Sequence, residues 1–315
     1  MPPRILIADG LSPAGVTLLE KLGEVTVSPK ITPDELKAVL PDYQALVVRS
    51  RTKVTRAVIE AGQSLQVIGR AGVGVDNIDV AAAIAAGVVV VNSPMAASVS
   101  VAEHTLGLLL ALARQIPAAD ASLKQGKWEK SAFIGTELAG KTLGLLGLGR
   151  IGALVANRAA VFGMTVVAYD PYLTETQIAE RNAQPATFEG VFQAADYLSL
   201  HLPLTADTRG LVSTNQLALL KQGARVVCAA RGGVLDEEAL RDALDSGQVA
   251  GAALDVFESE PPPPGSLAQH PRVIATPHVG AQTAEAQTRA GLAIAEEVSA
   301  VLQGKEPRWR VLAND

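Results

Sequence analysis

A glycine-rich turn is the part of this sequence whose residue types and spacing point most directly to chemistry. The run KTLGLLGLGRIG, residues 141–152, contains Gly147, Gly149 and Gly152. In dinucleotide-binding folds the first such glycine permits a tight strand-to-helix turn, the second lets the backbone approach a pyrophosphate, and the third allows close packing of helix against strand. The N-terminus of the helix then faces the phosphates. We therefore predict a dinucleotide site at this turn.

The segments around the turn have the pattern that such a site requires. An apolar strand over 142–146 precedes the glycines, a helix is expected over 151–162, and a second buried strand over 164–169 ends at Asp170. Asp170 is placed to accept hydrogen bonds from the adenosine ribose, and its charge would repel a 2′-phosphate, which favours NAD over NADP. The alternative is an aspartate that only stabilises a turn before Pro171.

The composition limits the class of protein and its partners. A length of 315 residues predicts two domains, and 48% hydrophobic but only 3% aromatic residues suit parallel sheets covered by helices. A net charge of −5 argues against nucleic acid or an anionic membrane as partner. The single cysteine, Cys228, excludes an internal disulfide, and the apolar run 106–113 is too short to cross a bilayer. We expect a cytoplasmic protein without a signal peptide or a metal.

Short strands alternate with helices along most of the chain, which predicts two α/β units. Thr32, Pro33 and Glu35 form a capping box that starts one of the helices. The helix over 98–114 is expected to cross between domains, and the helix over 283–302, followed by a short strand over 309–312, to return to the first. The domains are then 1–97 plus 284–315, and 98–283. The expected strands are 5–8, 25–27, 45–48, 67–69 and 88–91 in the first domain, and 142–146, 164–169, 197–201, 225–229, 250–255 and 272–276 in a six-stranded second sheet.

Six separated segments together resemble the D-isomer-specific 2-hydroxyacid dehydrogenases. The resemblance implies a flavodoxin-like substrate domain beside a Rossmann domain, an active site in the cleft between them, and a homodimer, or a homotetramer, formed largely by the cofactor domains. The segments are GRAGVGVDNID (69–79), GKTLGLLGLGRIG (140–152), HLPLTADTRGL (201–211), ARGGVLDEEAL (230–240), GAALDVFESEPP (251–262) and TPHVGAQT (276–283).

The resemblance carries a catalytic set onto three residues of this sequence. It implies that Arg231 binds the substrate carboxylate and carbonyl, that His278 is the acid/base, and that Glu260 is the partner of the histidine. These roles are chemically reasonable, because imidazole titrates near neutrality, a carboxylate orients it, and a guanidinium matches a planar carboxylate. Taken alone, His278 could simply cap a strand and Glu260 could be a solvated charge.

The resemblance also implies contacts for cofactor and substrate. His201 is expected to neighbour the cofactor, whereas His104 and His270 are expected to be structural or solvent-facing. Arg49, Arg51 and Lys130 could bind a substrate phosphate, although Arg51 and Lys130 could equally be surface charges. The further cofactor residues are Arg150, Ile151, Leu202, Pro203, Thr208, Ala229, Asp255 and Gly280, and the further substrate residues are Arg70, Val73 and Gly74.

Within the family, segments 47–55, 123–130 and 133–144 resemble the branch that oxidises D-3-phosphoglycerate to 3-phosphohydroxypyruvate for serine synthesis. A reductase of glyoxylate or hydroxypyruvate, another D-2-hydroxyacid dehydrogenase, and an NAD-sensing corepressor-like protein are the alternatives. Cys228 stands where the family often has asparagine, and residues 95–97 depart from its usual glycine or asparagine. Longer relatives continue into regulatory domains, so a chain that stops near Asp315 is expected to be a short form without feedback by serine.

Overall fold

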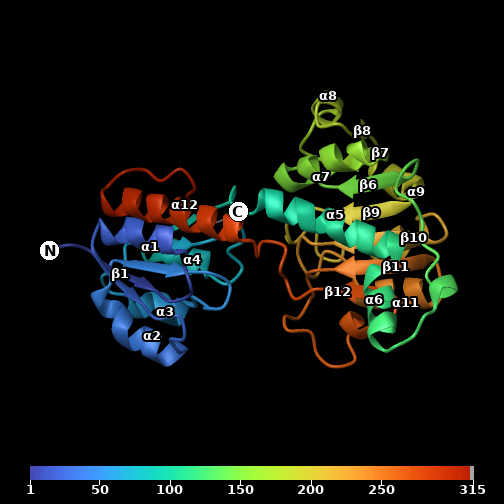
Figure 1. Ribbon diagram of the computed structural model, residues 1–315. Helices are drawn as coiled ribbons and strands as arrows, with labels where there is room; N and C mark the ends of the chain where they lie inside the picture. Colours follow the sequence, from blue (N-terminus) through green and yellow to red (C-terminus); the bar gives the residue numbers. More distant parts are fainter. Residues whose placement is uncertain (313–315) are drawn as a thin grey trace. The chain divides into compact units, whose positions relative to one another are not determined.

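The computed structural model describes residues 1–312, which form two compact α/β units (Figure 1). The first unit combines Met1–Ser98 with the stretch from Ala281 onward, and the second is the continuous segment Val99–Gly280. Each unit contains a parallel sheet with helices packed on both faces. The predicted fold class, α/β with two parallel sheets, is confirmed.

The first unit contains a five-stranded sheet with the order β2-β1-β3-β4-β5. The strand order reverses at β1, so β2 lies on one side of it and β3, β4 and β5 on the other. The elements are β1 (Arg4–Ile7), α1 (Pro13–Glu20), β2 (Glu24–Val27), α2 (Pro33–Val39), η1 (Leu40–Asp42), β3 (Ala45–Val48), α3 (Arg56–Ala61), β4 (Val67–Arg70), α4 (Val80–Ala85), β5 (Val89–Asn92) and α12 (Ala284–Leu302).

Alternating side chains of this sheet enter two separate cores. Ile5 and Ile7 pack with Ile294 of α12 on one face, while Leu6 packs with residues of α2 and α3 on the other. Helices α1 and α12 lie side by side in Figure 1, and they touch through their backbones. A Cβ atom at Gly15 would lie 2.6 Å from the carbonyl oxygen of Gly291.

The second unit contains a seven-stranded sheet with the order β12-β11-β10-β9-β6-β7-β8. Its elements are α5 (Ser98–Arg114, which begins at the last residue of the first unit), α6 (Ile116–Lys124), η2 (Lys130–Ala132), β6 (Thr142–Leu146), α7 (Arg150–Val161), β7 (Thr165–Tyr169), α8 (Glu175–Ala179), β8 (Gln184–Pro185), α9 (Phe188–Ala194), β9 (Tyr197–Leu200), α10 (Thr214–Ala218), β10 (Ala224–Cys228), α11 (Glu237–Asp245), β11 (Val249–Leu254), η3 (Leu267–Gln269) and β12 (Val273–Ala275).

Two details of the predicted strands were wrong. The second sheet has seven strands rather than six, because the two exposed residues of β8 pair with β7. The expected strand over 309–312 is instead a single antiparallel bridge between Arg310 and Val91. Neither segment has the buried apolar run that marks the other strands, so local sequence carries little signal for its pairing.

Both faces of the second sheet are covered by helices. Leu143 and Leu145 point to the face covered by α5 and α7, whereas Leu146 and Leu198 point to the face of α9, α10 and α11. Because all the strands are parallel, their carboxyl ends meet at one edge, where ligands bind in open α/β sheets. Every predicted glycine, acid and histidine of the second unit's site follows one of these ends.

Among the described residues, no single helix is long and apolar enough to cross a membrane. Helices α5 and α6 pass the length and composition test only as a pair, with a bend of 64° between them.

Candidate active site

The glycine turn links β6 to α7 as the sequence predicted. Gly147 has φ +87°, and a Cβ atom on it would lie 2.6 Å from the carbonyl oxygen of His201, so only glycine fits the turn. Gly149 is different, because nothing lies within 4 Å of the place where its Cβ atom would be. It precedes α7 and provides no side-chain cap. This open space before a helix N-terminus fits a pyrophosphate.

Asp170 follows β7 and is tied to the glycine turn. Its carboxylate accepts hydrogen bonds from the backbone N–H groups of Leu148, at 2.9 Å, and Tyr172, at 3.0 Å. The carbonyl oxygen of Leu148 accepts a further bond from Arg181, at 2.5 Å. The bond from Tyr172 agrees with the turn-stabilising role that was the alternative for Asp170, whereas the bond from Leu148, which orients the glycine turn, is a contact that spacing alone did not reveal.

His278 and Glu260 form a direct pair, with 2.8 Å between His278 Nδ1 and Glu260 Oε2. Glu260 also accepts the N–H of Phe257 at 3.2 Å. Burial alone would raise the pKa of Glu260, but the hydrogen bond and charge of His278 outweigh burial and lower it. The ionised carboxylate can only accept, so Nδ1 carries a proton and Nε2 is the nitrogen that can act as a base.

The loop that carries Arg231 packs directly on the loop that carries Glu260. A Cβ atom at Gly232 would lie 1.8 Å from the carbonyl oxygen of Phe257, so the two backbones are in contact at this glycine. Arg231 is partly buried and its Nη1 donates to the carbonyl of Ala230 at 2.7 Å. The loop of Arg231 thus contacts the loop of Glu260, and Glu260 contacts His278. The three predicted catalytic residues therefore lie on neighbouring loops of the second unit.

Asp255, at the end of β11, is only 1% exposed and anchors the turn after β12. Its carboxylate accepts the N–H groups of Val279 and Gly280, each at 2.8 Å, and the hydroxyl of Thr276 at 2.5 Å. Burial alone would raise the pKa of Asp255, but these hydrogen bonds and one from His104 lower it. Its expected contact with the nicotinamide stays a prediction, because the carboxylate already has these partners in the chain.

The other expected cofactor residues lie at the same edge of the sheet. His201 follows β9, and burial lowers the pKa of its imidazole to about 4, so it is neutral at physiological pH. Its Nε2 lies 3.0 Å from the hydroxyl of Ser199. Thr208 donates to the carbonyl of Pro203 at 2.6 Å, which closes the loop after His201. The remaining members are Leu202 beside the glycine turn, Ala229 after β10, and Arg150 and Ile151 in the first turn of α7.

Arg49 and Arg51 follow β3 in the first unit, and a buried aspartate separates their roles. Asp9 accepts the Nε–H of Arg51 at 3.0 Å but only the backbone N–H of Arg49, at 2.6 Å. Arg51 also donates to the carbonyls of Ala8 and Ile31. Burial lowers the pKa of the Arg49 guanidinium, partly offset by Asp9, and its Nη2 lies 3.5 Å from Gln282 Oε1. The guanidinium of Arg51 is thus held by the chain itself.

The other predicted substrate residues come from two places. Arg70, Val73 and Gly74 lie at the end of β4 and in the loop after it, and the Arg70 guanidinium lies against Gly72. Lys130 belongs to the second unit, where it is exposed on η2.

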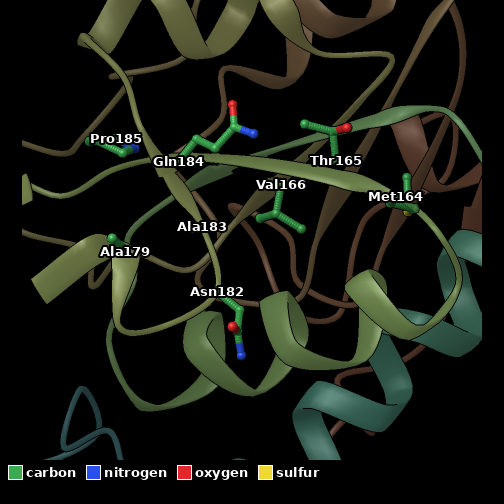
Figure 2. A pocket seen from close by; sticks show the side chains of 8 residues that line it. All are labelled: Met164, Thr165, Val166, Ala179, Asn182, Ala183, Gln184 and Pro185. Atoms are coloured by element: carbon green, nitrogen blue, oxygen red, sulfur yellow. The ribbon is translucent and has the colours of Figure 1, made fainter. Parts of the chain in front are cut away.

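A hollow of about 410 Å³ lies elsewhere, at the amino end of β7. Figure 2 shows the side chains that line it, among them Met164, Asn182 and Gln184. Since Asp170 and the glycine turn lie at the carboxyl ends of the strands, this hollow is separate from the predicted cofactor site. Within residues 1–312, no group of three or more His, Cys, Asp or Glu residues is arranged to hold a metal ion.

The two histidines that were expected to be structural or solvent-facing both contact other side chains. His104 contacts Thr276 and Asp255 behind the turn of His278, which fits a structural role. His270 contacts Asp245 at 3.2 Å, which fits the expected structural role. Cys228 is buried at the end of β10, where burial raises the pKa of its thiol to about 11.

Comparison with known proteins identifies the family. Residues 106–280 match the NAD binding domain of the D-isomer specific 2-hydroxyacid dehydrogenases. The chain is 50% identical over 304 residues to a D-3-phosphoglycerate dehydrogenase of Methanocaldococcus jannaschii, covering 96% of this chain but 58% of that protein. The chain thus spans little more than half the length of this relative.

Two solved structures are similar over nearly their whole length. The TT0316 protein of Thermus thermophilus is 35% identical, with a TM-score of 0.88, and the match covers 98% of this chain and 100% of that one. A glyoxylate reductase from Paecilomyes thermophila is 30% identical, with a TM-score of 0.89 and coverage of 100% and 99%. The chain belongs to the D-isomer-specific 2-hydroxyacid dehydrogenase family, as the sequence predicted, and its cofactor is NAD.

Proposed function

We propose that this member of the family is an NAD-dependent D-3-phosphoglycerate dehydrogenase, which oxidises 3-phosphoglycerate to 3-phosphohydroxypyruvate for serine biosynthesis. The 2.8 Å contact between His278 and Glu260 is the observation that carries the reaction type. The choice of substrate is supported by the 50% identity to the Methanocaldococcus jannaschii enzyme over 96% of this chain.

In this proposal His278 removes the hydroxyl proton of the substrate at Nε2. Glu260 holds the imidazole through Nδ1 and stabilises the positive charge that the ring acquires with the proton. Arg231 binds the substrate carboxylate through paired hydrogen bonds and polarises the carbonyl as it forms. NAD, when bound, supplies the acceptor for the hydride that leaves the carbon. Acid/base action of this kind contributes about 10²- to 10⁴-fold to a rate.

The cofactor would be held by the second unit. Gly147, Gly149 and Gly152, with Arg150 and Ile151, form the pyrophosphate turn, and Asp170 receives the ribose hydroxyls. The open space at Gly149 is the feature of the fold that supports this fit. The remaining contacts in the proposal are His201, Leu202, Pro203, Thr208, Ala229, Asp255 and Gly280.

The substrate would be held by Arg231 together with the first unit. Arg49 is the strongest candidate for the phosphate, because its guanidinium is partly desolvated and Asp9 binds only its backbone. Arg70, Val73, Gly74 and Lys130 complete the proposed set. Arg51 is the weakest member, because its guanidinium already contacts Asp9 and two carbonyl oxygens.

An unphosphorylated acid is the second candidate substrate. The similarity to the glyoxylate reductase, at TM-score 0.89, favours it, and so does the engagement of Arg51 by Asp9. The same histidine, glutamate and arginine would perform that reaction. The two candidates differ only in whether a phosphate group is recognised.

A parallel assay of purified protein tests the proposal. NADH formation is measured with D-3-phosphoglycerate, D-glycerate and D-lactate, and NADH consumption with glyoxylate and hydroxypyruvate, with NADP or NADPH as the control. We expect kcat/KM to be highest for D-3-phosphoglycerate by at least about tenfold. Turnover of unphosphorylated acids alone would assign the chain to the second candidate.

We also propose that the protein is a cytoplasmic homodimer, or a homotetramer, assembled through the second unit. Several large apolar side chains are exposed along α6 and the segment that follows it. They are Ile116 at 53%, Leu123 at 58%, Trp128 at 84% and Ile134 at 80% exposure. Light scattering of the parent protein and a Trp128→Glu variant tests this, since a charge at that position would dissociate the oligomer.

A further inference from the structure

A second histidine lies directly behind the turn that carries His278. His104, on α5, has its Nε2 atom 3.2 Å from Thr276 Oγ1 and 3.3 Å from Asp255 Oδ1. Thr276 and Asp255 come from the ends of β12 and β11, so the contact joins a helix to two strand ends. His104 is far from these residues in sequence, and nothing in the proposed chemistry requires it.

The hydrogen bonds fix where the proton of His104 must be. The hydroxyl of Thr276 donates its only hydrogen to Asp255 Oδ1, at 2.5 Å. An ionised carboxylate can only accept. Both neighbours of Nε2 therefore present lone pairs to it, so Nε2 carries a proton and donates to this pair of oxygens. His104 is a donor in the cluster, and an apolar side chain would remove that bond.

The same cluster controls the backbone around His278. This residue has φ +51°, a conformation that is unfavourable for non-glycine residues and persists only where neighbours impose it. Its own N–H donates to the carbonyl of Thr276 at 3.0 Å. The next two N–H groups, of Val279 and Gly280, donate to Asp255. The turn is thus held by residues that His104 contacts.

Helix α5 gives this contact a rigid base. Leu106, Leu108 and Leu109, which follow His104 along the helix, are at most 5% exposed and pack in the core beneath the second sheet. A side chain projecting from such a helix has little freedom to follow a moving loop.

We propose that His104 is a positioning residue, which acts through Thr276 and Asp255 to hold the turn of His278 in its left-handed conformation. His104 need not touch substrate or cofactor for this role. Loss of its hydrogen bond would allow the turn to relax and would displace the imidazole of His278 from the hydroxyl that it deprotonates. The kinetic part of this proposal rests on the proposed dehydrogenase function.

A matched pair of variants tests the proposal kinetically. His104→Leu removes the donor, whereas His104→Gln retains an N–H at a similar distance from the backbone. We expect His104→Leu to lower kcat by about ten- to a hundredfold, because small displacements of reacting groups have effects of this size. KM and the Kd of NADH should change by less than about twofold, and His104→Gln should restore kcat to within about threefold of the parent. An unchanged kcat in His104→Leu overturns the proposal.

Hydrogen exchange tests the turn without any assay of activity. The amides of Val279 and Gly280 should exchange at least about tenfold faster in His104→Leu and at the parent rate in His104→Gln. Equal exchange in both variants overturns the proposal, even if kcat falls. If the parent oxidises no hydroxyacid, the proposed function fails while this measurement still decides the positioning role.

A second pair covers the case in which His104→Leu does not fold. Thr276→Val keeps the shape of the side chain but removes the hydroxyl, and Thr276→Ser keeps the hydroxyl. We expect faster exchange and lower kcat in the valine variant only. Parent-like behaviour of both threonine variants would show that the cluster does not hold the turn, and would also overturn the proposal.

Discussion

Asp9 and Asp255 are buried carboxylates at the ends of parallel strands, one in each unit. Both are at most 4% exposed, and both accept backbone N–H groups from a loop that carries a predicted functional side chain. They differ in their side-chain partners. Each accepts a threonine hydroxyl, from Thr52 and from Thr276, but Asp9 also binds the permanently charged Arg51, whereas Asp255 also binds His104.

This difference follows from what each loop must carry. The loop held by Asp9 presents Arg49, whose charge does not change during the proposed reaction, so one arginine can neutralise the organising carboxylate. The loop held by Asp255 presents His278, which gains and loses a proton in the proposed reaction. A second carboxylate, Glu260, contacts the imidazole of His278, while Asp255 accepts backbone N–H groups of the loop. The two tasks of orienting the loop and stabilising its charge are separated in the second unit.

The largest effect is expected at His278, where the comparison assigns chemistry to the side chain itself. His278→Ala should lower kcat by about 10²- to 10⁴-fold while the Kd of NADH stays within about twofold, because the base is lost but the glycine turn is intact. Stopped-flow turnover and fluorescence titration with NADH measure the two quantities. A simultaneous loss of NADH binding and of the circular dichroism spectrum would indicate misfolding instead.

The next largest effect is a loss of stability when either aspartate is replaced. The two replacements should differ in which kinetic constant, kcat or KM, they change. Asp255→Asn should lower the free energy of unfolding by about 2–3 kcal/mol at pH 7 and also lower kcat, since bonds to a charged acceptor are lost. The pKa of Asp255 is lowered on folding, so this contribution is present above the unfolded pKa of about 4 and is lost as pH falls through the folded value. Urea denaturation between pH 7 and pH 3 should show the difference in free energy of unfolding between the parent and Asp255→Asn becoming smaller as the pH falls.

Asp9→Asn is the matched control for that experiment. It should destabilise the protein to a similar extent and raise the KM of the substrate, with kcat little changed. The reason is that the loop held by Asp9 carries Arg49, which is proposed to bind the substrate and not to take part in proton transfer. Equal losses of kcat in both variants would contradict the separation of roles.

A smaller effect distinguishes the two arginines beside Asp9. Arg49→Ala should raise the KM for D-3-phosphoglycerate by roughly 10- to 100-fold, the equivalent of one charge-assisted contact. Arg51→Ala should raise it by less than about threefold and lower the melting temperature, because its guanidinium is bound within the unit. Steady-state kinetics and calorimetry separate these results. A larger KM effect from Arg51 would reverse the assignment.

The smallest effect is expected at Lys130, which is exposed on η2. Lys130→Ala should raise the KM for D-3-phosphoglycerate by about three- to fivefold and leave that for D-glycerate unchanged, with Lys127→Ala as the control of equal charge. If the two lysine variants do not differ, Lys130 does not contribute to phosphate binding, and only residues of the first unit remain as candidates for it.

Most of the fold was predictable because buried parallel strands have continuous apolar runs. Residues 142–146 and 45–48 are examples, and both form the expected strands. The missed strand β8 consists of one glutamine and one proline, both exposed, so its pairing comes from the neighbouring chain and not from its own residues. The segment 309–312 was wrongly predicted as a strand from its apolar residues, of which only Val311 is buried, and the segment pairs with β5 through a single bridge.

The candidate site was predictable where short motifs define it, and less so where distant residues meet. The glycine turn and the contact of His278 with Glu260 agree with the motifs. The contacts of His104 with Thr276 and of Arg51 with Asp9 join residues 172 and 42 positions apart, a relation that spacing cannot reveal. One usable signal was present, since Asp255 directly follows a buried strand and Asp9 lies two residues after another, where an acid has a structural or functional reason to occur.

The backbone contact of α1 with α12 has a consequence for the order in which the protein is made. The second unit is one continuous segment and can complete its core once residue 280 has left the ribosome. The first unit has an unfinished core until Ile294, Ala295 and Val298 of α12 have been synthesised, although residues 1–98 of this unit precede the second unit. Because domains fold as units during synthesis, we expect the later half of the chain to become protease-resistant first. Strands β1–β5 must wait, with one apolar face only partly covered by α1, for a helix that follows the entire second unit in sequence.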